Sequence, residues 1–180
     1  PELRPPRAVR KGTYSPSAVV WHLGVRGRVH DDIAHHNIHF GHEWASAFDA
    51  LLHDGRLMPD PSRLVTVPSR SDPGAAPPGA STLFVLEPVP NLTAGPDWST
   101  EAGPMRERLL QFLDGAGYPT DIVAEELVTP LDWERGGLHL GTPFSLAHTF
   151  GQTGPFRPPN VEKRVPGVFF AGSGTVPGVG

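Results

Sequence analysis

The chain ends in the stretch R-V-P-G-V-F-F-A-G-S-G-T-V-P-G-V-G, which runs from Arg164 to Gly180. Its apolar run at 168–171 is bounded by turn residues, a pattern typical of a short strand buried on both faces. The glycines that follow, from Gly172 onward, let a backbone approach a ligand closely because they carry no Cβ atom. A strand, a glycine-rich turn and a helix start together present backbone N–H groups to an anionic ligand such as a phosphate. We therefore predict a ligand-binding turn, with a helix starting near Gly180, and interpret the sequence as a piece cut inside a functional motif.

The composition limits the class of protein. The 180 residues suffice for one domain, but 38% hydrophobic residues together with 21 glycines and 22 prolines indicate a loop-rich part of a larger enzyme. A net charge of -4 argues against a nucleic-acid partner, and the absence of cysteine excludes a disulfide framework and thiolate chemistry. No apolar run approaches the ~18 residues of a membrane-spanning helix, and no segment resembles a signal peptide.

The rest of the chain predicts a sheet with helices, an α+β class. Alternation of large apolar residues predicts a strand at 14–25, with Trp21 as a core residue. Shorter strands are expected at 37–41, 64–68 and 81–89. Helical spacing predicts helices at 43–53, with one face buried, and at 104–114, with Pro104 near its first turn. We interpret residues 1–13 as a solvated connector.

A group of histidines lies near the first strand: His22, His30, His35, His36, His39, His42 and His53. A zinc site is one interpretation, because His35 and His39 would share a face of a helix. The pattern at 37–41 instead favours a strand and a turn, which would send alternate side chains to opposite faces. No cysteine and no H-E-x-x-H motif is present, so we predict no metal site. A role in proton handling remains open for these imidazoles.

At the C-terminal stretch, A-G-S-G-T-V-P-G-V-G resembles the flavin motif of the bacterial-type phytoene desaturases, a branch of the FAD-dependent amine oxidase-like superfamily. Val179 departs from that motif, which has a small residue there. Blocks upstream are also similar to the family, among them the Y-S-P-S string at Tyr14 and the T-P-L-D-W string at 129–133. They include A-H-H-N-I-H-F-G at 34–41, D-P at 72–73, A-P-P-G at 76–79, V-L-E-P-V-P-N-L at 85–92, G-T-P-F-S-L at 141–146 and Q-T-G-P-F-R-P-P-N at 152–160. Pro159 stands where the family commonly has histidine.

The resemblance implies a two-domain flavoenzyme. It implies a mixed or antiparallel substrate-domain sheet at 14–135 and a return at 136–180 to a Rossmann-like FAD domain, whose N-terminal G-x-G-x-x-G is absent from this sequence. The implied cofactor is FAD. The implied substrate is phytoene or another C40 or C30 polyene, drawn from a membrane by a cytoplasmic, peripherally bound enzyme, and homo-oligomerisation is left open. The implied cofactor-binding residues are Gly172, Ser173, Gly174, Thr175, Pro177 and Gly178.

Desaturation requires a flavin to accept a hydride at N5 and a base or solvent to accept a proton. The sequence selects no base. The candidates near the matched blocks are Asp132, Glu134, His139 and His148. Glu125 and Glu126 are adjacent in an extended segment, so their side chains diverge and we expect both at the surface. Ser145 lacks the G-x-S-x-G context of a hydrolase nucleophile.

Three alternatives stay open. Related flavoenzymes with the same motif act as carotenoid 3,4-desaturases, ketolases, isomerases or retinol saturases. A chain without its dinucleotide half could be a non-catalytic product, and we expect the fragment alone to be inactive. A metal-binding module built on the histidines would carry stoichiometric zinc.

Overall fold

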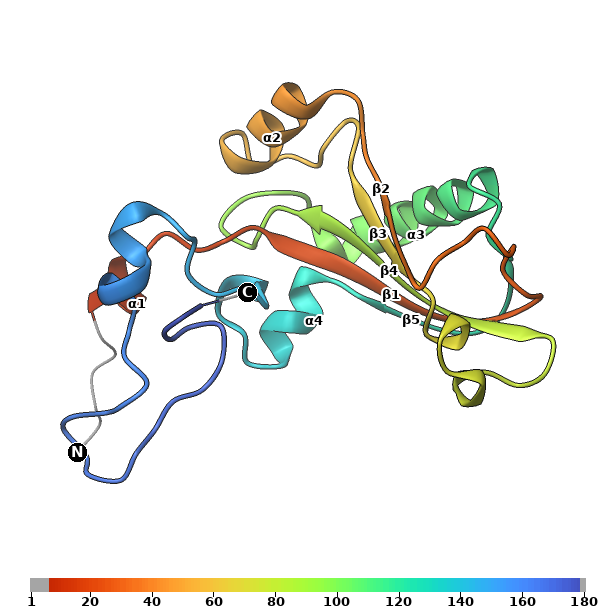
Figure 1. Cartoon of the computed structure of the whole chain (residues 1–180). Coiled ribbons are helices and arrows are strands. Elements are labelled where there is room, and N and C mark those ends of the chain that lie inside the picture. Colours follow the sequence, from red (N-terminus) through yellow and green to blue (C-terminus); the bar gives the residue numbers. More distant parts are fainter. Residues whose placement is uncertain (1–6, 179–180) are drawn as a thin grey trace.

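The computed structural model describes residues 7–178 and is built on a five-stranded antiparallel sheet (Figure 1). The strands follow the spatial order β2-β3-β4-β1-β5, and every pair is antiparallel. The strands are β1 (Ser17–Arg26), β2 (His36–His39), β3 (Arg63–Thr66), β4 (Ala80–Val89) and β5 (Asp121–Val128). The helices are α1 (Arg7–Lys11), α2 (Trp44–Leu52), α3 (Trp98–Gly115) and α4 (Pro130–Arg135). The expected α+β class is confirmed, and of the mixed or antiparallel sheet that was expected the structure has the antiparallel form.

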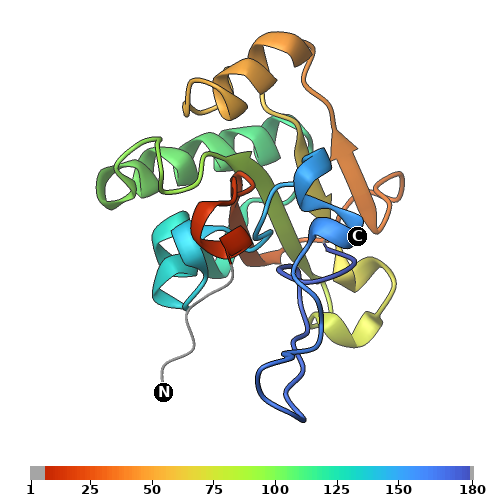
Figure 2. The same ribbon diagram turned by 90° about the vertical axis from the view of Figure 1, so that its left-hand side faces the viewer.

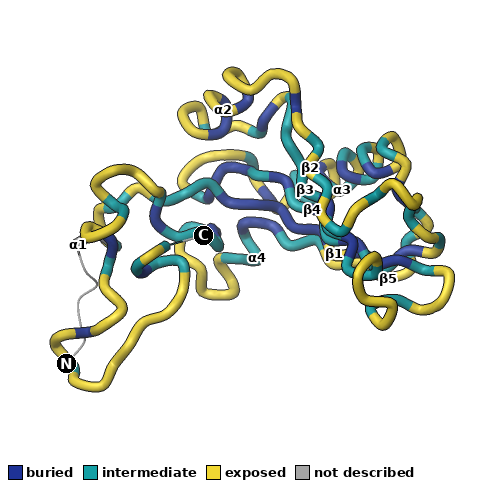
Figure 3. The backbone as a smooth tube through the Cα atoms, in the orientation of Figure 1, coloured by how far each residue is buried: buried dark blue, intermediate teal, exposed yellow. Residues whose placement is uncertain are grey.

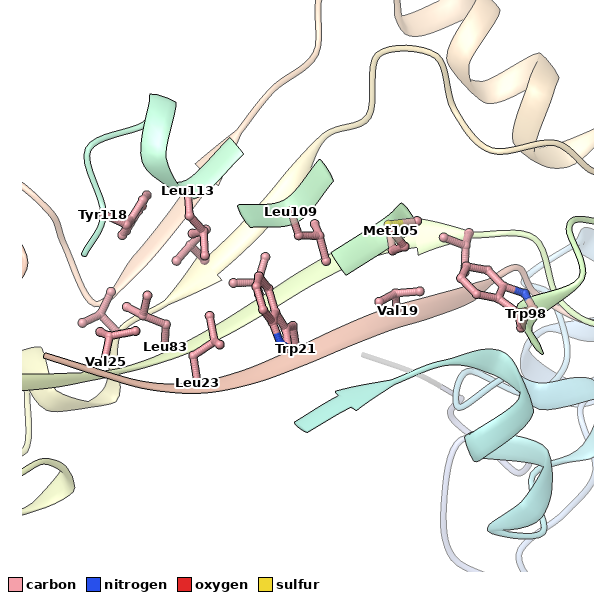
Figure 4. Close-up of a cluster of buried hydrophobic side chains, with 14 residues drawn as sticks. Val19, Trp21, Leu23, Val25, Leu83, Trp98, Met105, Leu109, Leu113 and Tyr118 are labelled. Atoms are coloured by element: carbon pink, nitrogen blue, oxygen red, sulfur yellow. The ribbon is translucent and has the colours of Figure 1, made fainter. Parts of the chain in front are cut away.

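One face of the sheet forms the core against α3. Alternate residues of β1 and β4 point to this face, and Figure 4 shows the β1 side chains reaching towards those of α3. Trp21 is fully buried at the centre, as predicted, and packs in one cluster with Met105 and Leu109 of the helix. Burying a large apolar side chain is worth about 1.5–3 kcal/mol, so this face supplies most of the stabilising apolar contacts.

Helix α3 begins six residues earlier than the sequence indicated. Asp97 caps it, because its carboxylate accepts a hydrogen bond of 2.9 Å from the amide of Ser99. Pro104 consequently lies inside the helix, and the prediction that it stands in the first turn was wrong. The helix tolerates this proline because Met105, Leu109 and Leu113 are buried against the sheet.

Helix α2 projects from the sheet edge near β2 (Figures 1 and 2). It forms as predicted and ends before Gly55, whose φ of +62° suits glycine. Its buried residues are Ala47, Ala50 and Leu51. The larger side chains of Trp44, Phe48 and Leu52 are exposed. The predicted buried face is therefore confirmed for Ala47 and Leu51 only, because little of the described chain packs against this helix.

The C-terminal segment, residues 136–178, has no strand and only short 3-10 turns at His139–Gly141, Phe150–Gln152 and Gly154–Phe156. Much of it is exposed (Figure 3). Its start is tied to the approach to β1, since Ser15 donates from its amide to the Ser145 carbonyl oxygen at 2.8 Å and Ala147 donates to Thr13 at 2.9 Å.

The run at 168–171 is not the doubly buried strand that the sequence predicted. Within residues 7–178 it makes one isolated bridge, between Phe169 and Val161, and Phe169 is 73% exposed. A buried strand needs neighbours at both edges and cover on both faces, and the described residues provide neither. The helix expected near Gly180, and Val179, lie outside the described residues. Across the described part, no helix combines the length and the apolar character needed to cross a membrane.

Candidate functional site

The glycine-rich turn, Gly172–Gly178, is closed by its own threonine. Thr175 donates to the carbonyl oxygen of Gly172 from both its amide (3.2 Å) and its hydroxyl (3.1 Å). Gly172 has a φ of +126°, which side-chain-bearing residues rarely adopt, and a Cβ there would meet open space. The side of the turn at Gly172 is therefore free for a ligand to approach.

Backbone donors are available in this turn. Within residues 7–178, the amides of Ser173 and Gly174 donate to no protein acceptor. Successive unpaired N–H groups in a turn with left-handed backbone form an anion-binding concavity. These donors fit an anionic or carbonyl oxygen of a flavin nucleotide. The residues present therefore suit the predicted cofactor.

Two side chains of the F-R-P-P-N block hold the turn from behind. Arg157 donates to the Ser173 carbonyl oxygen from Nε at 3.2 Å and from Nη2 at 2.5 Å. Asn160 donates from its amide to Thr175 Oγ1 at 3.2 Å and to the carbonyl oxygen of Val176 at 2.8 Å. The sequence matched this block to the family but gave Arg157 and Asn160 no role. The available signal was the match of this block to the family shortly ahead of the glycines.

The other side of the turn is closely packed. A Cβ atom at Gly178 would collide with Nε2 of His148 and press on the Arg157 guanidinium. A Cβ at Gly174 would lie 3.1 Å from Ser145 Oγ. The glycines therefore serve two purposes, since some leave space for a ligand and others allow the chain to pack on itself.

A cavity of about 670 Å³ opens beside the turn. Its wall is mostly apolar, and two basic residues stand at it. The lining includes Pro158, Val161, Lys163, Arg164, Phe170 and Thr175. A mostly apolar wall with a few polar groups is typical of cofactor and small-molecule sites.

The structure separates the four candidate proton acceptors. Asp132 completes a capping box, accepting from the amide and hydroxyl of Thr129 at 2.9 and 2.6 Å. Burial works to raise the pKa of Asp132, but hydrogen bonds from Thr129 and the nearby Arg135 outweigh it and leave that pKa below its ordinary value. Asp132 is therefore a poor base, and its role is to cap the N-terminus of α4.

The other three candidates lie in different places. Glu134 is exposed on α4, and His139 packs edge-to-face on Tyr14 with ring centroids 4.8 Å apart. His148 lies against Gly178, so it is the candidate that the fold brings to the turn. Ser145 also lies beside the turn, close to Gly174.

The histidines near β1 do not converge. The rings of His35 and His36 pack together, but their Nδ1 atoms bind different hydroxyls, Ser71 Oγ at 2.7 Å and Thr66 Oγ1 at 3.0 Å. His39 lies on the α3 side, where its Nε2 meets the Tyr118 hydroxyl at 2.9 Å. Among residues 7–178, no three histidine, aspartate or glutamate side chains gather as a metal site would require.

Glu125 and Glu126 are both exposed, as predicted. Glu125 nevertheless has a structural role, because it accepts hydrogen bonds from Trp21 Nε1 at 2.9 Å and from Arg106. The hydrogen bond from Arg106 is the main cause of a lowered pKa for Glu125.

A buried ion pair in the core was missed from the sequence. Glu87 of β4 is 2% exposed and accepts from Nε of Arg63 at 2.6 Å, and the Arg63 guanidinium also lies over the ring of Phe112. Burial raises the pKa of Glu87, and Arg63 only partly offsets this. The available signal was a glutamate at a core-facing position of an alternating strand.

The second face of the sheet, opposite α3, carries a groove of about 490 Å³. Its lining combines His22 and Gly24 of β1, Thr82 and Phe84 of β4, and Glu126 of β5. The hydroxyl of Thr82 is buried without a hydrogen-bond partner there. This groove is the feature of the sheet that could receive a substrate.

Comparison with known proteins gives the family of the chain. The family model for flavin containing amine oxidoreductases matches residues 1–179, and the chain belongs to that family. Family membership implies a flavin cofactor. Among curated relatives, the chain is 48% identical over 174 residues to "Phytoene dehydrogenase" of Streptomyces griseus, covering 93% of this chain and 34% of the relative. It is 37% identical to a "zeta-carotene-forming phytoene desaturase" of Myxococcus xanthus, covering 93% and 33%.

A third relative, a "Carotenoid 3,4-desaturase" of Haloarcula japonica, is 36% identical over 93% of this chain and 34% of its own length. The chain thus spans about a third of the length of the curated relatives that it matches. The resemblance noted in the sequence to carotenoid desaturases of the amine oxidase-like superfamily is confirmed.

Proposed function

We propose that the protein to which this chain belongs is an FAD-dependent oxidoreductase that desaturates phytoene or a similar long polyene. The observation that carries the proposal is the glycine-rich turn with unpaired amides at Ser173 and Gly174, held by Arg157 and Asn160. The 48% identity to a phytoene dehydrogenase supports the choice of substrate class.

In this proposal the turn binds FAD, and Gly172, Ser173, Gly174, Thr175, Pro177 and Gly178 are the cofactor-binding residues. The bound flavin supplies a hydride acceptor, which no protein side chain can provide. The chain contributes the backbone amides of Ser173 and Gly174 as hydrogen-bond donors. Arg157 holds these amides in place by binding the carbonyl oxygen of Ser173. The adjoining apolar wall, with Phe170 and Pro158, excludes water.

We further propose that residues 14–135 form part of a substrate domain and residues 136–180 the return to the FAD domain of a two-domain enzyme, with 1–13 as a connector. The groove beside His22 and Phe84 would face the polyene, since no α-helix of the described chain lines it. His148, next to Gly178, is the residue best placed to take up a proton.

A polyene of this length dissolves in membranes and not in water, so we propose that the enzyme works in the cytoplasm, peripherally bound to a membrane.

The test is pigment analysis of the full-length gene product in cells that accumulate phytoene and no coloured carotenoid. We expect phytoene to fall and neurosporene, ζ-carotene or lycopene to appear, with FAD released from the purified protein on denaturation. Unchanged phytoene beside a soluble, flavin-loaded protein would exclude this substrate. In that case, lycopene would be supplied next, because one relative is a carotenoid 3,4-desaturase.

A further inference from the structure

Arg157 stands out among the arginines of the described chain. It is 2% exposed, and its guanidinium donates to three carbonyl oxygens, those of Leu146 (3.0 Å), Gln152 (3.2 Å) and Ser173. Within residues 7–178 it forms no ion pair with a carboxylate. Burying a cation without a counter-charge costs free energy of folding, so we looked for a role of the Arg157 charge.

The same chain shows how a half-buried arginine is otherwise neutralised. Arg63 meets the carboxylate of Glu87 at 2.6 Å, so its positive charge has a negative partner. Arg157 is satisfied in its hydrogen bonds but keeps its full positive charge behind the turn. Carbonyl oxygens satisfy hydrogen bonds without cancelling that charge.

The position of this charge relates it to the ligand. The guanidinium binds the Ser173 carbonyl oxygen on one side, and the unpaired amides of Ser173 and Gly174 belong to the same peptide stretch. It also lies against Gly178 at the far end of the turn. A ligand bound to the free amides is therefore separated from the Arg157 guanidinium only by the backbone of the turn.

We propose that Arg157 is a positioning residue with a second, electrostatic effect: it fixes the turn on which the flavin rests and favours the two-electron-reduced, negatively charged flavin over the oxidised one. This inference rests on the proposed function. Charge near a flavin ring system shifts the balance between its redox states, and a desaturase needs a flavin that readily accepts two electrons. The forked guanidinium holds three carbonyl oxygens at once, which an ammonium group cannot reproduce.

Two substitutions separate geometry from charge. Arg157→Lys keeps the charge and loses the fork, whereas Arg157→Gln keeps one amide donor and loses the charge. The matched control is Arg56→Gln, since Arg56 is an exposed arginine that pairs with Asp54 away from the turn. All variants are made in the full-length gene product. The midpoint potential is measured by dye-coupled reduction, and FAD affinity by titration of the apoprotein.

For both Arg157 variants we expect FAD to bind about tenfold more weakly, the equivalent of one charge-assisted hydrogen bond. For Arg157→Gln we also expect the preference for reduced over oxidised flavin to fall about tenfold, which is about 30 mV in a two-electron couple. Arg157→Lys should keep the wild-type potential, and Arg56→Gln should match wild type in both measurements.

The outcomes distinguish the two proposals. A folded wild-type protein that binds no flavin contradicts the proposed function itself. A flavin-loaded protein whose potential is the same in Arg157→Gln and wild type overturns the electrostatic inference, and unchanged FAD affinity in Arg157→Lys overturns the positioning role. If the glutamine variant does not fold, Arg157→Met takes its place as the variant without the charge: a lowered potential supports the electrostatic inference, and an unchanged potential overturns it.

Discussion

The sheet with α3 and the C-terminal segment are stabilised by different kinds of interaction. The sheet and α3 bury Trp21, Val85 and Leu109 completely, and β1 and β4 are joined by an unbroken ladder from Ser17–Val89 to Arg26–Ala80. The C-terminal segment buries one large apolar residue, Leu146, and otherwise depends on side chains that bind backbone carbonyl oxygens, above all Arg157 and Asn160. Apolar burial is tolerant of small changes in position, whereas hydrogen bonds are directional.

This difference agrees with the proposed division of labour. A substrate-facing sheet needs a rigid base, which α3 provides. A cofactor turn needs free backbone donors, and those donors would be consumed if the segment were a regular strand or helix. We expect substitutions in the sheet to change global stability and substitutions in the segment to change local opening and ligand affinity.

The largest effect should come from the centre of the sheet. Trp21→Ala should lower the free energy of unfolding by about 3–5 kcal/mol, because a fully buried indole is removed and a cavity is left. Trp44→Ala on α2 is the matched control. It removes the same side chain from a site that is 50% exposed and should cost less than about 1 kcal/mol. Urea unfolding measures both, and equal losses would contradict the assignment of the core.

The buried ion pair should come next. Arg63→Met leaves the Glu87 carboxylate buried and unpaired, so we expect a loss of about 3 kcal/mol. The double variant Arg63→Met with Glu87→Leu should recover most of it, because no buried charge remains. A double variant that is no more stable than the single one in urea unfolding would show that the pair itself contributes the stability.

Asn160→Ala tests whether the C-terminal segment opens on its own. It removes the amide that binds Phe170, Thr175 and Val176, so local opening should become easier by about 1–2 kcal/mol. Hydrogen exchange should then be about tenfold faster at the Val176 amide, while the urea midpoint stays unchanged. Asn37→Ala, which removes an amide bound to Ala34 and Val65 beside β3, should show the reverse pattern.

Gly103, inside α3, and Gly117, just after its C-terminal end, test whether backbone conformation is what requires a glycine. A Cβ at Gly103 or at Gly117 would meet no atom within 4 Å, so both positions have room for a side chain. The two positions differ in their backbone conformation. Gly117 has a φ of +78°, whereas Gly103 lies inside the helix. Gly103→Ala should stabilise the protein by about 1 kcal/mol, and Gly117→Ala should destabilise it by a similar amount. If thermal unfolding shifts the same way in both, backbone conformation is not the cause.

The smallest effect concerns pH and the loop at 160–170. Hydrogen bonds from Arg164 are the main cause that lowers the pKa of Glu162 from 4.5 to about 2. Because this carboxyl is more acidic in the folded state, its contribution is present above about pH 4.5 and is lost as the pH falls through about 2. An NMR titration of the Glu162 carboxyl should show this value, and Arg164→Gln should return it towards 4.5. A wild-type value near 4.5 would exclude the ion pair in solution.

Several elements could be predicted because their signals are local. Alternation in β1 and β4 placed the strands, and it placed Trp21 in the core. Helix α2 and the turn at Gly55 followed from spacing and from glycine chemistry. The beginning of α3 was misjudged, because Pro104 was taken as a helix start when the cap at Asp97 already supplied one.

The side-chain contacts within the candidate site could not be predicted from local signals. The glycines of the turn were identified, but Arg157 lies fifteen residues before Gly172, and no sequence pattern states which carbonyl oxygens its guanidinium will meet. The same holds for the pairing of Arg63 with Glu87. Side-chain contacts between segments that are distant in sequence depend on the final path of the backbone.

The sequence by itself determined the α+β class, the glycine-rich turn and the family resemblance, because periodicity and backbone freedom are properties of neighbouring residues. Only the tertiary structure decided that 168–171 is exposed, that the histidines do not converge, and that an unpaired buried cation stands behind the turn. Those outcomes depend on burial and on distances between segments, which a linear order of residues does not contain.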